Sequence, residues 1–514
     1  MVSKDLDVPK TLLTWLAMKV AATFALFVTC LLVFSPLSKA ERADLADGRP
    51  ILGPWCVEDD KRGPGQPKPY CGDLPTLASV NIREAQLKLI TRDLKRPWAM
   101  EFIDAETLLI NEFPGSMKRL SLADGTTEDI DGLPKVAFGR NQEGLLDLVL
   151  HPAFASNGLV YFSYVSDHPR DATYVLNLAR ATLVGTRLNN VEVLIKATPF
   201  SKLVSNFGGA ILFESDDTLL FSTGDRARPK SAQNPQNLHG KILRLKDDGS
   251  IPADNPFVDD PGYHPAVYSI GVRNPQGLVK HPQSGLIYET EHGPMGGDEV
   301  NLISGGLNYG WPTFSYGMDY LYKSVGVASP PEGFELPLFY YLPSRAISPI
   351  EVYSGPMFPE WEGDLLVGAL RAWSVSRIDL HQGRVLSESI ILKELKGRVR
   401  DIKSAPDGAI FLLVENGKLF RLSRSVSSAT VAAAGEGTGR QIYHSVCHSC
   451  HNQKVPGAPQ LGAKADWAER LPKGEAALVE NSVKGYGAMP AMGLCEYCTE
   501  EDIARAVAFM LGRL

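Results

Sequence analysis

The segment "SDDTLLFSTGD", residues 215–225, joins a polar turn to a short apolar strand, and the same pattern recurs along the chain. The turn carries Asp, Asn or Gly, and the strand after it is rich in Leu, Ile, Val and aromatic residues, which is typical of short β-strands between tight turns. Five further copies are "DAETLLINE" (104–112), "SNGLVYFSYV" (156–165), "QSGLIYETEHG" (283–293), "EGDLLVGALR" (362–371) and "PDGAIFLLVEN" (406–416). The middle of the chain is therefore expected to be all-β.

The spacing of the six copies indicates the architecture. They lie 50, 60, 67, 79 and 45 residues apart when aligned on one apolar position in each, namely Leu109, Leu159, Leu219, Leu286, Leu365 and Ile410. A blade of a β-propeller uses about 40–50 residues, and longer loops add to that. Six such units predict an all-β six-bladed β-propeller over residues 85–424, with a pair of packed sheets as the alternative.

The first 40 residues have the composition of an export segment. Lys4, Lys10 and Lys19 precede a charge-free apolar run at residues 20–37, and small residues stand before a cleavage point after Ala40. The run is close to the length that spans a bilayer, about 17–20 residues, so a cleaved signal peptide and an uncleaved anchor both fit residues 1–40. We expect a periplasmic protein, either soluble or anchored to the inner membrane by its N-terminus, with residues 11–37 as the tether.

The charge balance and the cysteines agree with an exported globular protein. The net charge of −7 lacks the basic footprint that nucleic-acid binding requires. Cys56 and Cys71 form one local pair and Cys495 and Cys498 another, and both pairs are candidates for disulfides in an oxidising compartment. Residues 41–84 are assigned to an N-terminal extension that holds the Cys56–Cys71 pair.

The C-terminal part of the chain carries a different signal. Residues 425–440 are small and polar, as in a flexible linker. Beyond them, Cys447, Cys450 and His451 form C-x-x-C-H, the attachment signature of haem c. The two cysteines would form thioethers to the porphyrin, and His451 would bind the iron. A structural zinc site would need a second Cys/His pair at metal spacing, which the neighbouring sequence lacks.

Residues 441–514 are expected to form a small all-α domain. Thr499 and Asp502 make a capping box ahead of the helical pattern "EEDIARAVAFML". The segment "GYGAMPAMGLCEYC" offers Met489 and Met492 as the second axial iron ligand. This tail resembles class I cytochromes c, in which a G-x-M-P motif supplies the distal methionine. By that resemblance Met489 is the ligand and the Cys495/Cys498 pair is a disulfide.

Four polar segments in the predicted propeller suggest a site for an anion. In chain order they carry His151, the Arg273–Asn274 pair, His292 with the nearby Asp298 and Glu299, and the Arg398/Arg400 pair. Because Arg398 and Arg400 are two residues apart, they share one face of a strand. Two adjacent guanidinium groups are costly unless they bind an anion, and a polycarboxylate would suit them.

Residues 95–422, approximately, resemble the soluble quinoprotein aldose dehydrogenases of the glucose/sorbosone dehydrogenase family, which are six-bladed propellers that use pyrroloquinoline quinone (PQQ) and calcium. The resemblance is carried by "GLLDLVLHP", "NLHGKILRLKDDGSIPADNP", "GVRNPQG", "EHGPMGGDEVNL", "NYGWP" and "RVRDIKSAPDG". It implies that His151 is the base for the sugar C1 hydroxyl and that Arg273 also acts in catalysis. The cofactor contacts that it implies are Arg273, Asn274, His292, Arg398 and Arg400.

The same resemblance implies two calcium sites. The backbone carbonyls of Gly293 and Pro294 would hold the calcium beside PQQ, and a structural calcium would be held by Glu299, Tyr309 and Asp319. One position departs from the family pattern. A cofactor-contacting Lys of the fifth blade is Arg371 here, and a planar guanidinium does not reproduce the geometry of an ammonium group.

Together these features predict an enzyme that oxidises aldoses at C1 to aldonolactones by hydride transfer to PQQ and passes the electrons to its own haem c. Two alternatives are a calcium-dependent propeller hydrolase, such as a lactonase, and a non-catalytic sugar-binding propeller with a haem tail. The expected partners are an aldose and a downstream periplasmic or membrane electron acceptor. The sequence leaves a homodimer open and gives no sign of nucleic-acid binding.

Overall fold

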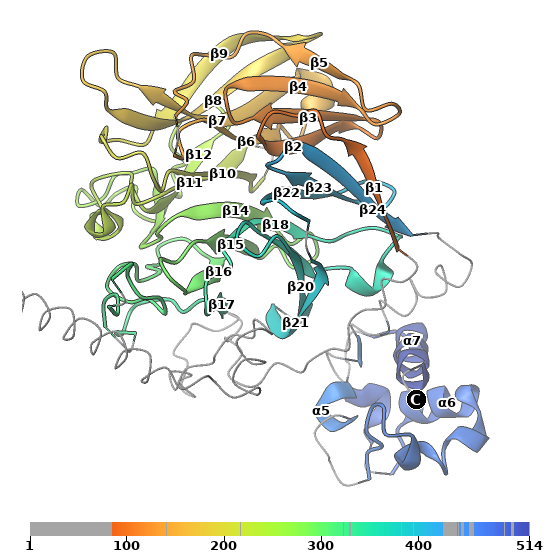
Figure 1. The fold of residues 1–514 in the computed structure, drawn as a ribbon. Coiled ribbons are helices and arrows are strands. Elements are labelled where there is room, and N and C mark those ends of the chain that lie inside the picture. The colour runs from red at the N-terminus through yellow and green to blue at the C-terminus, as the bar shows by residue number, and fades with distance from the viewer. Residues whose placement is uncertain are drawn as a thin grey trace, which may run out of the picture. The chain divides into compact units, whose positions relative to one another are not determined.

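The computed structural model describes residues 85–512, except for residues 140, 216, 322, 328–329, 382, 394, 425–438, 440–441, 444–446, 452–456, 488 and 495–497. The predicted export segment, the 41–84 extension with Cys56 and Cys71, and most of the predicted linker lie outside the described residues. Figure 1 shows a β-rich part, which runs from Ala85 to Arg424, and a helical C-terminal part.

The β-rich part of the described chain consists of six four-stranded antiparallel sheets. The first three sheets contain β2 (Pro97–Asp104), β3 (Thr107–Glu112), β4 (Ser116–Ser121) and β5 (Thr127–Ile130); β6 (Leu145–Leu150), β7 (Leu159–Asp167), β8 (Tyr174–Val184) and β9 (Arg187–Lys196); and β10 (Gly208–Phe213), β11 (Thr218–Thr223), β12 (Lys241–Lys246) and β13 (Val267–Ile270).

The remaining three sheets contain β14 (Pro275–Lys280), β15 (Ile287–Glu291), β16 (Asp298–Ile303) and β17 (Phe339–Tyr341); β18 (Ile347–Val352), β19 (Leu365–Ala369), β20 (Val375–His381) and β21 (Arg384–Leu392); and β22 (Val399–Ser404), β23 (Ile410–Val414), β24 (Lys418–Arg424) and β1 (Ala85–Thr91). In the last sheet β1 pairs antiparallel with β24 as the outermost strand.

The first strands of successive blades are neighbours around a common axis. β2 contacts β6, β6 contacts β10, and the series continues through β14 and β18 to β22, which returns to β2. This closed ring of six blades is a six-bladed β-propeller, as the spacing of the repeats predicted, and the alternative of two packed sheets is wrong.

The six repeated segments supply the second strand of every blade. They coincide with β3, β7, β11, β15, β19 and β23, with Leu286 directly before β15. All six residues of β11 are buried, on both faces of the sheet. A propeller strand packs against the neighbouring blade on each face, so the repeats are continuous apolar runs rather than alternating ones.

The hydrophobic core lies between adjacent blades. Tyr161 and Leu178 of the second blade pack in one cluster with Phe221 and Leu243 of the third. Equivalent clusters join other neighbouring blades. For example, Tyr288 of the fourth blade is in one cluster with Leu365 and Val367 of the fifth. Because these contacts link residues far apart in sequence, the ring must close for the core to form.

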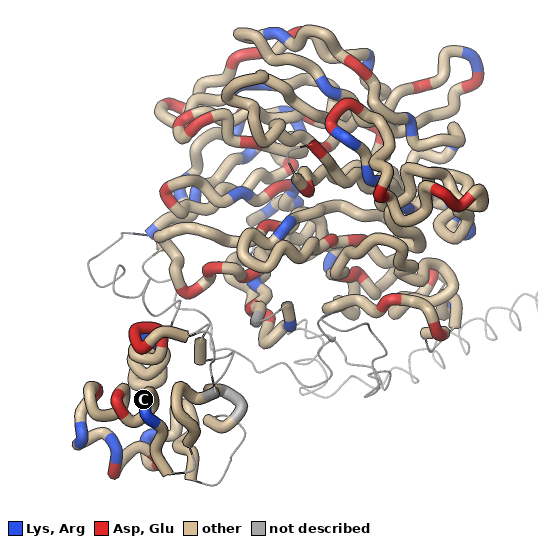
Figure 2. The backbone as a smooth tube through the Cα atoms, turned by 180° about the vertical axis from the view of Figure 1, so that it is seen from behind, with Lys and Arg blue, Asp and Glu red and all other residues tan. Residues whose placement is uncertain are grey.

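Charged residues of both signs are interspersed along the blades, as Figure 2 shows. This mixture agrees with the small net charge of the chain, −7. A concentration of arginine inside the ring is therefore a local feature and not part of a generally basic surface.

The C-terminal part contains α5 (His448–His451), α6 (Glu475–Lys484) and α7 (Glu500–Leu511), together with short 3-10 turns. Thr499 caps α7, because its side chain accepts from the Asp502 amide while the Asp502 carboxylate accepts from the Thr499 amide. The predicted capping box is thus confirmed. Leu478 of α6 packs against Ile503 and Val507 of α7. No helix within the described residues has the length and apolar character to cross a membrane.

Candidate active site

A cavity of about 560 Å³ lies at the mouth of the propeller where the first strands of the blades begin. Each first strand contributes a lining residue at its start or one position before it: Trp98, Leu146, Gly208, Gln276, Ala346 and Arg400. The second strands run antiparallel, so their ends reach the same mouth. His292 follows β15, and Leu370 and Arg371 follow β19.

Three guanidinium groups of the cavity lining surround one carboxylate. Glu415 pairs with Arg400 at 2.6 Å, with Arg96 at 3.4 Å and with Arg398 at 3.7 Å. Three positive charges against one negative charge leave a net charge of +2. Although burial favours the neutral acid, Arg400, Arg398 and Arg96 hold the pKa of Glu415 below its usual value. The cluster can therefore accept further negative charge.

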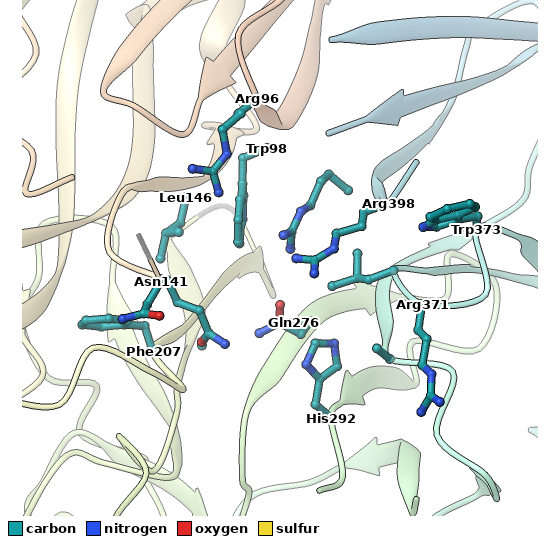
Figure 3. Close-up of a pocket in the computed structure, with 15 residues that line it drawn as sticks. Arg96, Trp98, Asn141, Leu146, Phe207, Gln276, His292, Arg371, Trp373 and Arg398 are labelled. Atoms are coloured by element: carbon teal, nitrogen blue, oxygen red, sulfur yellow. The ribbon is translucent and has the colours of Figure 1, made fainter. Parts of the chain in front are cut away.

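The two predicted strand arginines differ in exposure. The Arg400 side chain is 5% exposed and stacks on the Trp98 ring, with its guanidinium carbon 3.9 Å from the ring centroid. Burial lowers the pKa of Arg400 to about 10, and this leaves the group charged at neutral pH. The Arg398 side chain is 56% exposed and points into the cavity (Figure 3). Arg400 is thus held rigidly, while Arg398 is free to adjust to a ligand.

His292 lines the floor of the cavity, and Figure 3 shows its ring directed toward Gln276 and Arg398. Burial, followed by the charges of Arg273 and Arg400, lowers the pKa of His292 to about 3, so the imidazole is neutral. Its Nδ1 lies 3.5 Å from the Asn274 amide nitrogen, and its buried Nε2 has no hydrogen-bond partner among the described residues. A neutral ring with an unpartnered nitrogen can donate or accept a proton on a ligand.

Arg273 lies behind the cavity floor rather than in its lining. Its guanidinium donates to the backbone oxygen of His292 at 2.7 Å and to that of Gly293 at 3.1 Å. Its own backbone amide donates to the Glu291 carboxylate, as does the Asn274 amide at 3.1 Å. Arg273 and Asn274 therefore fix the position of His292 from below.

Three of the predicted calcium ligands, Gly293, Tyr309 and Asp319, already make hydrogen bonds within the protein. The Gly293 carbonyl already accepts from the Arg273 guanidinium, and a calcium ion on that oxygen would face a second cation. The Tyr309 hydroxyl donates to the Leu302 carbonyl, and the Asp319 carboxylate accepts from two amides of its own turn. Within the described ranges, no three His, Cys, Asp or Glu side chains are placed to hold a metal ion.

Glu299 lies in a buried group of carboxylates instead. It faces Glu291 across the β15–β16 pair, and the Asn301 amide donates to both Glu289 and Glu299. Burial, together with the Glu291 charge, raises the pKa of Glu299 well above its usual value. Without a cation beside them, burial favours the neutral form of these carboxylates.

His151 is not in the cavity, so its assignment as the sugar base is not supported. It follows the last residue of β6, whereas the cavity is lined by Leu146 near the start of that strand. Five residues of strand separate the two by about 16 Å. The His151 ring instead lies 5.2 Å from Phe213, the last residue of β10, with Nδ1 2.9 Å from the Asn157 amide nitrogen. His151 belongs to the opposite mouth of the ring.

Arg371 lies at the cavity rim with an exposed side chain. In Figure 3 its guanidinium points away from His292 and Arg398. Several lining residues were not predicted from the sequence, among them Arg96, Trp98, Gln276 and Trp373. A usable signal existed for Arg96 and Trp98, because they stand two residues apart at the start of β2, as Arg398 and Arg400 do at the start of β22.

In the C-terminal part, the contacts of His451 are those expected of an iron ligand. Its Nδ1 lies 2.8 Å from the Pro459 carbonyl oxygen and donates its proton there, which leaves Nε2 as the free coordinating nitrogen. Burial lowers the pKa of His451 and so favours the neutral ring that binds metals. Cys447 and Cys450 are not linked to other cysteines.

The two candidate methionines have different surroundings. Met492 packs against the apolar cluster of Leu478, Ile503 and Val507 between α6 and α7. Met489 lies in a tight turn in which its backbone exchanges two hydrogen bonds with Tyr486. Met489 is thus the methionine that the helical core leaves available. Cys498 is disulfide-bonded, while Cys495 lies outside the described residues.

A comparison with known families matches residues 94–421 to the family described as Glucose / Sorbosone dehydrogenase. This chain belongs to the glucose/sorbosone dehydrogenase family. Residues 434–510 match a second family, described as Cytochrome C oxidase, cbb3-type, subunit III. The chain is therefore an oxidoreductase propeller followed by a cytochrome c domain.

Individual relatives agree with both parts. The chain is 33% identical over 353 residues to Aldose sugar dehydrogenase YliI of Escherichia coli, which covers 67% of this chain and 93% of that protein. The PQQ-bound Aldose Sugar Dehydrogenase of Streptomyces coelicolor has a TM-score of 0.56 and 25% identity, and the match covers 66% of this chain and 98% of that structure. Cytochrome c-555 of Chlorobaculum tepidum is 38% identical over 106 residues, which are 18% of this chain and 98% of that protein.

Proposed function

We propose that this protein is a PQQ-dependent aldose dehydrogenase that oxidises its sugar at C1 and delivers the electrons to its own haem c. The observation that carries the proposal is the group of Arg96, Arg398 and Arg400 around the single carboxylate of Glu415. Its excess positive charge suits a polyanion, and PQQ carries three carboxylates. The names of the E. coli and S. coelicolor relatives support the same choice.

The cavity residues fit a planar anionic cofactor. Arg400 is fixed between Glu415 and the Trp98 ring, so its charge is preorganised, and Arg398 can close on a carboxylate from the open side. His292 lines the same space, and its buried Nε2 has no hydrogen-bond partner among the described residues, so a ligand that displaces the ring slightly would supply the missing hydrogen bond. When bound, PQQ would supply the acceptor for the two electrons of the sugar C1–H bond.

His292 is our choice for the group that receives the C1 hydroxyl proton. Among the described lining residues it is the one neutral titratable side chain, since the other titratable groups there are arginines, which are already protonated. Burial is the main cause of the low pKa of His292 in the free protein, and a bound anion would offset the smaller contribution of the Arg273 and Arg400 charges. The C1 hydrogen would leave as a hydride to the bound cofactor, the hydroxyl proton would go to His292, and the cyclic sugar would become a lactone.

The cytochrome domain would take the electrons one at a time. Cys447 and Cys450 would attach haem c, and His451 and Met489 would be its axial ligands. A methionine ligand raises the haem potential, which suits an acceptor. The domain would then reduce a further periplasmic or membrane partner. We also propose export to the periplasm through residues 1–40.

Reconstitution tests the function directly. The purified haem-containing chain is given PQQ, with and without calcium, and then a panel of aldoses, while the α band of reduced haem is followed. We expect reduction of the haem that requires both PQQ and an aldose, and an aldonolactone as the product. The calcium arm decides whether the metal is needed, because the described side chains assign it no place.

The two rivals predict different results. A hydrolase would open lactones without any change in the haem spectrum, and a binding propeller would bind sugar but leave the haem oxidised. If the wild-type protein binds no PQQ, either with calcium or without it, the proposal is wrong.

A further inference from the structure

Trp373 stands at the rim of the cavity as an exposed aromatic residue without ring partners. It lies in the connection between β19 and β20, lines the cavity, and is 47% exposed. Within the described part of the chain, its ring makes no stacking contact with another aromatic ring and carries no cation above it. About half of the Trp373 surface is therefore open to a ligand.

The backbone at Trp373 is held in an unusual conformation. Its φ of 51° is in the left-handed region, which is uncommon for a bulky residue. Hydrogen bonds on both sides hold the loop: the Leu370 amide donates to the Ala346 carbonyl at 2.8 Å, and the Leu395 amide donates to the Trp373 carbonyl at 3.1 Å. The indole is thus presented at the rim by a fixed support and not by a loose loop.

Neighbouring tryptophans are already engaged. Trp98 stacks on Phe113 with a centroid distance of 4.7 Å and also carries the Arg400 guanidinium. Trp311 is buried, donates through its indole nitrogen to Asp225, and lies under Arg273. Each of these two rings thus packs against an arginine of the site, Trp98 against Arg400 and Trp311 against Arg273. Trp373 differs from them because its ring has no aromatic or cationic partner among the described residues and is 47% exposed.

We propose that Trp373 is the platform on which the pyranose ring of the substrate sugar rests. The inference rests on the proposed function, because it assigns the sugar of that same site. A pyranose has an apolar C–H face and polar edges, and an open aromatic surface binds the apolar face. Asn141 lines the cavity on the side opposite Trp373 (Figure 3), where an amide can meet the hydroxyl groups. Trp373 therefore contributes to sugar binding and selectivity, while the arginines hold the cofactor.

The test compares Trp373→Ala and Trp373→Phe with wild type and with a control, Tyr320→Ala, whose side chain is 68% exposed and does not line the cavity. KM and kcat are measured for an aldopyranose with a soluble dye that accepts electrons from the cofactor, and haem reduction is measured separately. We expect Trp373→Ala to raise KM about five- to tenfold with kcat within about twofold, since an aromatic contact contributes on the order of 1 kcal/mol.

Three further results distinguish the possible roles of Trp373. Trp373→Phe should recover most of the loss of affinity, and sugar should quench indole fluorescence less in that variant than in wild type. An unchanged KM in Trp373→Ala would overturn the proposal, and slower haem reduction at unchanged KM would make Trp373 a contact for the cytochrome domain. A loss of PQQ affinity would also overturn it, because the loop would then be supporting the cofactor. If wild type itself shows no sugar-dependent reduction, the proposed function fails instead.

Discussion

His151 and His292 both follow an apolar strand, yet they lie at opposite mouths of the propeller. His151 follows β6, the first strand of its blade, and His292 follows β15, the second strand of its blade. First and second strands are antiparallel, so the end of one reaches the mouth where the other begins. The position of a strand within its blade thus decides which mouth receives the residue after it.

This rule accounts for the composition of the cavity mouth. Arg96 and Arg398 precede first strands, whereas His292, Arg371 and Glu415 follow second strands. The opposite mouth collects residues such as His151 and Glu214, which follow the ends of first strands. The first group assembles the cationic cluster around Glu415.

Replacing each of the two histidines by glutamine, in separate variants, should show the largest difference between the two mouths. Glutamine keeps a hydrogen-bond donor but cannot take up a proton. His292→Gln should lower kcat by about 10²–10⁴, the usual contribution of a general base. His151→Gln should stay within about threefold of wild type. Steady-state kinetics with an aldose and a dye acceptor measure both variants, and the reverse pattern would return the role of base to His151.

For cofactor binding, the corresponding test compares Arg400, which lines the cavity, with Arg244, which does not. Arg400→Gln should weaken PQQ binding about 10–100-fold, because a charge-assisted hydrogen bond contributes about 1.5–3 kcal/mol. Arg244→Gln is the matched control, since Arg244 also pairs with two carboxylates, Glu214 and Asp254. Calorimetric titration with PQQ measures the affinities. Equal losses in the two variants would show that the effect is structural.

The pH dependence of cofactor binding sharpens the assignment of His292. Burial, followed by the charges of Arg273 and Arg400, holds its pKa at about 3 in the free protein, and the pKa should rise when a bound anion offsets those charges. PQQ binding should then take up a proton between those two pKa values, so affinity should increase severalfold as the pH falls from 7 to about 5. Titration in buffers of different ionisation enthalpy detects the proton. His292→Gln should show no such uptake.

The smallest effect concerns the buried carboxylates beneath the site. Burial raises the pKa of Glu291 to about 7. A raised folded-state pKa contributes stability that is present below the unfolded value, about 4.3, and is lost as the pH rises through 7. Glu291→Gln should therefore lose a few degrees less in Tm between pH 5.5 and 8 than wild type does. Glu128→Gln, on an exposed side chain, is the control and should follow wild type.

Much of the fold was predictable because each blade repeats one local pattern. The six apolar segments identified every second strand, and the Arg398/Arg400 spacing placed both side chains at the cavity. The site was harder to predict, because its residues come from all six blades. A motif read alone also does not indicate at which mouth of the propeller its residues lie. His151 was misplaced for that reason, and Trp373 was missed because an exposed aromatic at a turn has no periodicity.

The pairing of β1 with β24 has a practical consequence for shortened forms of the protein. The family match begins at residue 94, after the end of β1. A chain cut at that boundary would lack the outermost strand of its last blade and leave β24 as an open edge, with unpaired amides and carbonyls next to apolar residues. Such edges recruit strands from other molecules and promote aggregation. Versions prepared without the export segment should accordingly retain Ala85 and the residues that follow it.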